Sequence, residues 1–135
     1  ALLATNRVHT TGRLDEVPLA QALGGASGMV FVPWFEGFGI PLVEAMAAGV
    51  PVVASNVTSL PKVGGDAVCA WVDPGNPVAI SEAMLQVEAQ PQKRAEHVDL
   101  GLDRAKAFSW RESGQKLDAA VDDLLQPSRH AQDVA

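Results

Sequence analysis

The segment from Val30 to Ser55 constrains the fold of this chain more than any other part of the sequence. It reads VFVPWFEGFGIPLVEAMAAGVPVVAS: a short apolar run, a loop with two glycines, a run of good helix formers and a second apolar run. Apolar runs of this kind are typical of strands buried on both faces, and the order strand–helix–strand favours a parallel sheet. We therefore predict an α/β fold with strands at 29–33 and 51–55 joined by a helix at 41–48.

The loop before this helix predicts an anion site. Gly37 and Gly39 flank Phe38 and let the backbone turn tightly, and Pro41 suits the first helical turn because its missing N–H needs no partner there. We expect the N–H groups of about residues 39–43 to be unpaired, at the positive end of the helix dipole. Such a helix N-terminus, just beyond the carboxyl end of a parallel strand, favours a phosphate or diphosphate.

Two glutamates bracket this predicted anion site. Glu36 precedes the loop, and Glu44 lies on the first turns of the helix. Carboxylates are poor ligands for phosphate, but they accept hydrogen bonds from the hydroxyl groups of a ribose or a hexose. A phosphate site beside hydroxyl acceptors suggests a sugar nucleotide. Glu44 also has a purely structural interpretation, as a favourable partner of the helix macrodipole.

The run from Glu36 to Glu44, EGFGIPLVE, resembles the E-x7-E signature of retaining glycosyltransferases of the GT-B fold, in particular family 4 (glycosyl transferases group 1). The similarity extends roughly from Val8 to Leu117, and several linked motifs in the right order are more specific than one glycine pattern. The further matching positions are Pro33, the run EAMAAGVPVVAS, Leu60-Pro61, Gly64-Gly65-Asp66, Val72-Asp73-Pro74 and Phe108-Ser109-Trp110.

The resemblance implies roles for individual residues. Glu36, the catalytic residue of this interpretation, would hydrogen-bond the donor sugar near the reacting centre. Glu44 would bind the ribose hydroxyls, and the loop around Arg13 and Leu14 would lie against the nucleobase. The backbone N–H groups that would face the sugar and its diphosphate belong to Gly37, Phe38, Gly39, Ile40, Leu42 and Val43.

The implied reaction is sugar transfer with retention at the anomeric carbon, in which the diphosphate leaves and its growing charge is stabilised by preorganised N–H donors. Family 4 enzymes generally do not depend on a tightly bound metal, so the expected small molecule is the nucleotide-diphosphate sugar as donor substrate, with no cofactor. The chain itself offers no clear metal site, because its histidines are isolated and Cys69 has no second cysteine.

The chain departs from the family pattern at two places. Lys62 stands where the family usually has Glu, which reverses a charge near the nucleotide end of the site. That lysine could assist an anion, or it could show that the site has drifted. Trp34 and Phe35 replace the usual Pro-Ser before the loop; they could line a sugar pocket, but such aromatic residues are more often part of a core.

At 135 residues the chain is one small domain, whereas a GT-B enzyme has two Rossmann-like domains with the active site between them. We interpret residues 1–126 as the C-terminal half of a nucleotide-sugar-binding domain and 127–135 as a flexible tail, and we expect this piece alone to be inactive. Two alternatives remain: a non-catalytic α/β module that binds a nucleotide or a partner, and a sugar phosphorylase of the same fold.

The rest of the chain predicts further elements. We expect strands at 7–11 and 67–72 and helices at 17–23, 77–89, 91–107 and 110–125, with Asn76 and the Ser109…Glu112 capping box as helix starts. In a Rossmann-type sheet the strand at 7–11 would not neighbour the strand at 29–33. It would therefore lie apart, move beside that strand, or pair with another chain. The exposed edge of strand 29–33 makes self-association possible.

Charge and composition narrow the partners. The formal net charge of −6 argues against nucleic acid and anionic membranes as partners. No apolar run is long enough to cross a bilayer, the N-terminus has no signal-peptide layout, and a single cysteine suggests a reducing compartment. We therefore expect a cytoplasmic protein whose partners are a nucleotide-sugar donor and an acceptor that the sequence does not identify.

Overall fold

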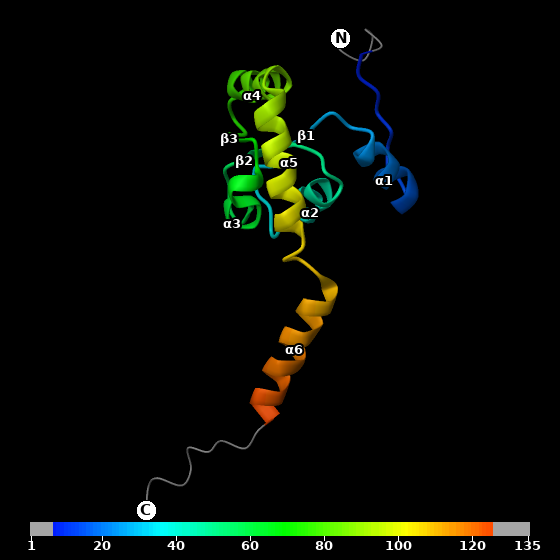
Figure 1. Ribbon diagram of the computed structural model, residues 1–135, viewed down its shortest axis with the longest axis vertical. Helices are drawn as coiled ribbons and strands as arrows, with labels where there is room; N and C mark the ends of the chain where they lie inside the picture. The colour runs from blue at the N-terminus through cyan, green and yellow to red at the C-terminus, as the bar shows by residue number, and fades with distance from the viewer. Residues whose placement is uncertain (1–6, 126–135) are drawn as a thin grey trace, which may run out of the picture.

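The computed structural model describes residues 7–125, which form an α/β fold with a three-stranded parallel sheet flanked by helices (Figure 1). The strands are β1 (Met29–Phe31), β2 (Val52–Ser55) and β3 (Ala70–Val72), in the order β1-β2-β3. Val53 of β2 lies between Val30 and Ala70 of its two neighbours. The predicted parallel sheet is confirmed, with first and last strands shorter than predicted.

One helix precedes the first strand and the others follow the strands, close to the predicted positions. They are α1 (Glu16–Gly24), α2 (Ile40–Ala47), α3 (Leu60–Gly64), the 3₁₀ turn η2 (Gly65–Ala67), α4 (Pro77–Ala89), α5 (Pro91–Ala105) and α6 (Trp110–Leu125). Two predicted caps are present: the Asn76 side chain accepts from the Ala79 N–H at 3.0 Å, and Ser109 Oγ accepts from the Glu112 N–H at 3.1 Å. None of the helices within residues 7–125 combines the length and apolar character that a membrane span needs.

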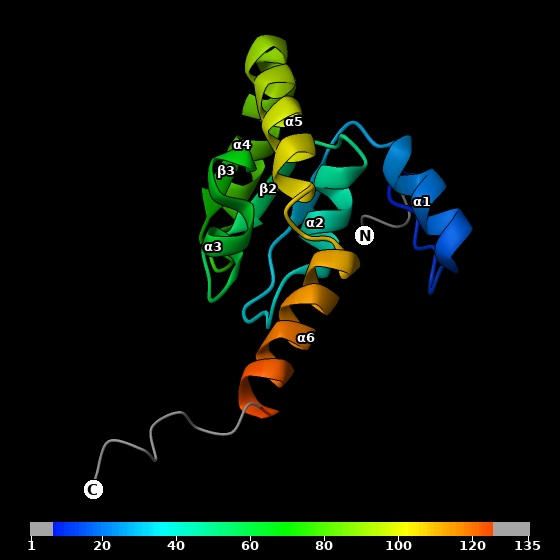
Figure 2. The ribbon, with the colours of Figure 1, turned by 60° about the horizontal axis from the view of Figure 1, so that its bottom comes forward.

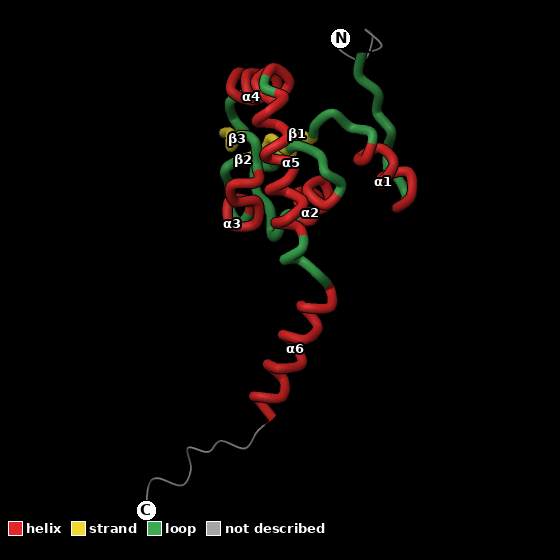
Figure 3. The backbone as a smooth tube through the Cα atoms, viewed as in Figure 1, coloured by secondary structure: helices red, strands yellow, loops and turns green. Residues whose placement is uncertain are grey.

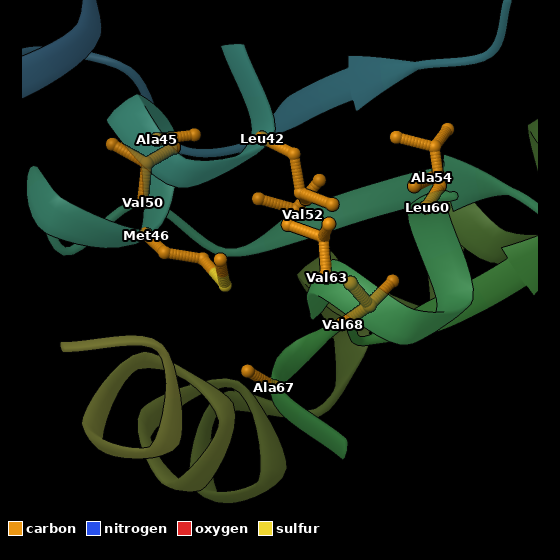
Figure 4. Close-up of a cluster of buried hydrophobic side chains, with 10 residues drawn as sticks. All are labelled: Leu42, Ala45, Met46, Val50, Val52, Ala54, Leu60, Val63, Ala67 and Val68. Atoms are coloured by element: carbon orange, nitrogen blue, oxygen red, sulfur yellow. The ribbon is translucent and has the colours of Figure 1, made fainter. Parts of the chain in front are cut away.

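The core lies on both faces of the central strand β2, all of whose residues are buried. Val52 and Ala54 face one side, where Leu42 of α2 and Leu60 of α3 are fully buried (Figure 4). Val53 faces the other side, where it joins a smaller cluster that includes Ala83 of α4. Because neighbouring side chains of a strand point to opposite faces, the apolar run at 51–55 is explained by burial on both of them.

The N-terminal segment differs from the prediction. Residues 7–11 form no strand, and Figure 3 shows the segment before α1 as loop. Helix α1 follows where predicted but buries none of its residues. A strand needs a hydrogen-bonded neighbour, and β1, at the edge of the sheet, pairs only with β2 among the described residues. In this single chain the segment therefore does not move beside β1, and its pairing with another chain stays a prediction.

The C-terminal helix α6 extends away from the body of the molecule (Figures 1 and 2). Its large aliphatic side chains are exposed, and no residue of the helix is buried. These side chains are Leu117, Val121, Leu124 and Leu125. The predicted tail at 127–135, which includes His130, lies outside the described residues.

Candidate functional site

The loop at 33–39 leads from the carboxyl end of β1 into α2, as the sequence predicts. Gly39, the N-cap residue of α2, has φ +99° and ψ 45°, a conformation that residues with a Cβ adopt only under strain. A Cβ at Gly39 would also lie 2.6 Å from Cδ2 of Leu60, which is fully buried. Glycine is thus required at position 39 both for its backbone conformation and for close packing on α3.

The Glu36 carboxylate lies over the backbone of this loop. Its Oε1 accepts hydrogen bonds from the Gly39 N–H at 3.2 Å and from the Phe38 N–H at 3.4 Å. Two loop N–H groups therefore converge on one carboxylate oxygen, in charge-assisted hydrogen bonds that the sequence did not predict. A ligand that used these two donors would have to displace Glu36 Oε1 from them.

The other N–H groups of the first helical turn differ from the prediction. The N–H groups of Leu42 and Val43 both donate to the Gly39 carbonyl oxygen, at 3.0 and 3.3 Å. The prediction that the N–H groups of residues 39–43 are unpaired is therefore wrong for Gly39, Leu42 and Val43. The carbonyl of an N-cap residue normally accepts the first intrahelical bond, and Pro41 has no N–H. From Glu36 to Val43, the backbone N–H groups left without an acceptor are those of Gly37 and Ile40.

Hydroxyl groups at the end of β2 and in the segment that follows it hydrogen-bond the backbone of the loop. Thr58 Oγ1 donates to the Glu36 carbonyl at 2.7 Å, and Ser59 Oγ lies 3.2 Å from the carbonyl oxygens of both Glu36 and Phe38. The buried Ser55 donates to the Pro33 carbonyl at 2.8 Å. The sequence motifs assigned no role to these three residues, although hydroxyl side chains at the end of a strand and three to four residues beyond it are a usable signal beside a glycine loop.

An aromatic and cationic contact holds the tip of the loop. The ring of Phe38 meets the ring of Phe108 edge to face, with centroids 5.6 Å apart. The guanidinium carbon of Arg104 lies 5.2 Å from the centroid of Phe108, and Arg104 also hydrogen-bonds backbone carbonyls of α3. Phe108 was noted in the sequence only as part of a motif, and nothing in the sequence pattern pointed to Arg104.

With this geometry in place, comparison with known proteins is informative. The model of the family described as glycosyl transferases group 1 matches residues 1–99. This chain belongs to the glycosyl transferases group 1 family. It is 43% identical over 103 residues to the O-antigen chain mannosyltransferase B of Escherichia coli, covering 76% of this chain and 27% of that protein.

Two further similar proteins support the assignment of this chain to group 1. It is 36% identical over 107 residues to the MMP alpha-(1->4)-mannosyltransferase of Mycolicibacterium hassiacum, covering 77% of this chain and 26% of the relative. The solved sucrose-phosphate synthase of Thermosynechococcus elongatus superposes with a TM-score of 0.78 at 28% identity, covering 88% of this chain and 30% of that one. The predicted GT-B fold is confirmed, and the chain spans about a quarter of the length of the two mannosyltransferases.

The remaining predicted site residues of this group 1 chain lie at different distances from the loop. Glu44 is exposed on α2, one turn beyond Ile40. Arg13 and Leu14 precede α1, and Figures 1 and 2 both place that blue segment apart from the cyan loop between β1 and α2. The structure therefore brings Glu36 and the α2 N-terminus together, but it does not bring Arg13 and Leu14 to them.

The two aromatic residues at the start of the loop are exposed, so the expectation that they belong to a core is wrong. Trp34 is 74% exposed and Phe35 is 77% exposed. The Trp34 ring lies against the turn after β3, where a Cβ on Gly75 would be 3.1 Å from Trp34 Cη2. These side chains follow the carboxyl end of β1, so they border the open side of the loop instead of the sheet interior.

Two further groups that can carry a charge are Lys62 and Cys69. The side chain of Lys62 is exposed on α3, while its backbone carbonyl accepts a hydrogen bond from Arg104 Nη2 at 2.7 Å. Burial raises the pKa of the Cys69 thiol above its ordinary value, because the charged form would lose solvation just before β3. Within residues 7–125, no three His, Cys, Asp or Glu side chains gather closely enough to hold a metal ion.

Proposed function

We propose that this chain is the donor-binding segment of a retaining family 4 hexosyltransferase, which moves a sugar from a nucleotide-diphosphate sugar to an acceptor. The observation that carries the proposal is the Glu36 carboxylate, held by the N–H groups of Phe38 and Gly39 at the entrance to α2. Family membership supports it, and the names of the two mannosyltransferase relatives favour mannose as the sugar.

In the proposed reaction, the bond between the anomeric carbon and the diphosphate oxygen breaks, and a bond to the acceptor oxygen forms on the same face. Negative charge grows on the departing diphosphate oxygen, which takes up the proton that the acceptor hydroxyl gives up. The free N–H groups of Gly37 and Ile40 lie where they would stabilise that charge. Glu36, once displaced from its own loop, would accept a hydrogen bond from a hydroxyl of the sugar.

Further parts of the donor have proposed sites. Glu44 is exposed on α2 and would bind the ribose hydroxyls. Arg13 and Leu14 would lie against the nucleobase only after their segment moves toward the loop. We propose a cytoplasmic enzyme that uses no cofactor besides its donor, and we propose that these 135 residues alone do not transfer sugar.

The test uses the full-length protein that contains this segment. Glu36→Ala and Glu44→Ala should each lower transfer from GDP-mannose or UDP-glucose, and we expect the loss for Glu36→Ala to be about a hundredfold or more. Glu82→Ala is the matched control, because Glu82 is an exposed glutamate on α4. The anomeric configuration of the product, determined by NMR, tests retention.

Two results would redirect the proposal. Full transfer activity in Glu36→Ala would remove Glu36 from the mechanism and favour the non-catalytic binding module. Release of a sugar phosphate that depends on added inorganic phosphate would instead identify a phosphorylase, which uses the same site residues with a different acceptor.

A further inference from the structure

Arg104, in the last turn of α5, connects this helix to the end of α3. Its Nε donates to the Val63 carbonyl at 2.9 Å and its Nη2 donates to the Lys62 carbonyl at 2.7 Å. The last carbonyls of a helix have no intrahelical partner, and α3 has only five residues. A guanidinium satisfies two such carbonyls at once and also interacts favourably with the negative end of the helix dipole.

The contact continues from Arg104 to the tip of the glycine loop. The guanidinium lies over the ring of Phe108, 5.2 Å from its centroid, and the edge-to-face contact between Phe108 and Phe38 has an interplanar angle of 83°. Both geometries are favourable for aromatic rings, whose faces carry partial negative charge. An unbroken series of contacts thus joins α3, the end of α5 and the loop.

Phe38 is the residue through which this series could influence a ligand. Its backbone N–H is one of the two donors to Glu36 Oε1, and its carbonyl oxygen lies 3.2 Å from Ser59 Oγ. Phe38 is 46% exposed, so its ring contacts Phe108 but is not enclosed by the protein. Because the ring and this N–H belong to one residue, a displacement of Phe38 as a whole would redirect an N–H group at the site.

We propose that Arg104 and Phe108 are positioning residues of the donor site, which act through Phe38 to aim the loop N–H groups at the diphosphate. The inference rests on the proposed function. Neither residue touches the loop donors directly: Arg104 orients Phe108, and Phe108 fixes Phe38. Phe108 also packs against the main core, so an experiment must separate positioning from stability.

The experiment measures transfer kinetics, nucleotide diphosphate affinity and melting temperature for conservative variants of the full-length protein. Phe108→Leu keeps an apolar side chain without an aromatic face, and Arg104→Lys keeps the charge without the planar fork. We expect kcat to fall about tenfold in each, with a smaller change in KM, because the N–H groups act on charge that develops in the transition state. The Kd for GDP, UDP or ADP should rise about threefold to tenfold for whichever nucleotide the protein binds.

A double-mutant cycle tests whether Phe108 acts through Phe38. If it does, Phe38→Leu combined with Phe108→Leu should lower kcat no further than the more damaging single variant. Independent, multiplicative losses would overturn the inference. So would an unchanged kcat in Phe108→Leu and Arg104→Lys, or a loss that only follows a lower melting temperature. Lys106→Ala is the control, because Lys106 pairs with Asp103 on the exposed side of the same region.

The result for Glu36→Ala separates this inference from the proposed function. If Glu36→Ala abolishes transfer while Phe108→Leu behaves like the unmodified protein, the positioning inference fails and the proposed function stands. If Glu36→Ala transfers sugar normally, the proposed function fails, and changes in Phe108→Leu then no longer concern donor chemistry.

Discussion

The carboxyl ends of the strands and the outer edge of β1 are built in opposite ways. At the carboxyl ends, the loop at 33–39 is held by three hydroxyl side chains and by the ring of Phe108. At the outer edge of β1, Val30 is exposed and the adjacent helix α1 buries none of its residues. The first region is held by side chains at the end of β2, just after β2 and just after α5. At the second region, the described residues provide no comparable hydrogen bonds or packing contacts.

The largest expected effect comes from adding one methyl group inside the well-supported region. Gly39→Ala should lower the free energy of unfolding by about 4 kcal/mol, because it combines backbone strain with a clash against Leu60. Gly37→Ala is the matched control: Gly37 has no positive φ, and a Cβ there meets nothing within 4 Å. Urea denaturation measures both variants, and equal losses of stability would contradict the special role of Gly39.

Gly37→Ala also sharpens the comparison in a second way. Because its stability should stay within about 0.5 kcal/mol of the unmodified protein, any loss of nucleotide affinity reports a blocked approach to the loop and not unfolding.

A smaller effect is expected from one of the hydroxyl groups that hold the loop. Ser55→Ala should lower the free energy of unfolding by about 2 kcal/mol, because it leaves the Pro33 carbonyl without its 2.8 Å donor. The buried position of Ser55 prevents water from replacing that donor easily. Urea denaturation measures this loss. Ser27→Ala, at an exposed position before β1, should change the free energy of unfolding by less than about 0.5 kcal/mol in the same measurement.

The smallest effect on stability is expected at the unsupported edge. Val30→Lys should change the free energy of unfolding by less than about 0.5 kcal/mol, since Val30 is already exposed. It should, however, reduce self-association of the isolated chain in sedimentation velocity, because a charge on an edge strand opposes pairing with a second copy. Val78→Lys, on exposed α4, provides the control; if it reduces association as much, the β1 edge is not the contact surface.

Much of the fold follows from local sequence signals. Helix α4 begins after Asn76 and ends at Ala89 as predicted, because an Asn cap and a following proline determine a helix start with little help from the rest of the molecule. The strand predicted at 7–11 failed for the opposite reason. Its apolar and β-branched residues favour a strand, but pairing depends on a neighbour that the local pattern does not supply.

The candidate site shows the same limit. Glycines 37 and 39 and the two glutamates were found from spacing, since a strand–loop–helix order places them at one edge of the sheet. The contact of Arg104 with Phe108 and α3 was not, because it joins residues up to 42 positions apart and follows no periodic pattern. The exposure of Trp34 could not be predicted either, because an aromatic residue after a strand is compatible with a core or with an open edge.

The hydrogen bonds of Glu36 to its own loop affect which ligands can bind tightly. The N–H donors of Phe38 and Gly39 are already satisfied by Glu36, so an incoming anionic oxygen would replace one acceptor with another and gain little net hydrogen-bond energy. The displaced carboxylate, in turn, loses two donors and needs a new one. A fully ionised diphosphate has no hydroxyl to offer it, whereas a molecule with an alcohol hydroxyl beside its phosphate does. On the proposed function, the glutamate would therefore favour ligands that present both groups over ligands that present phosphate alone.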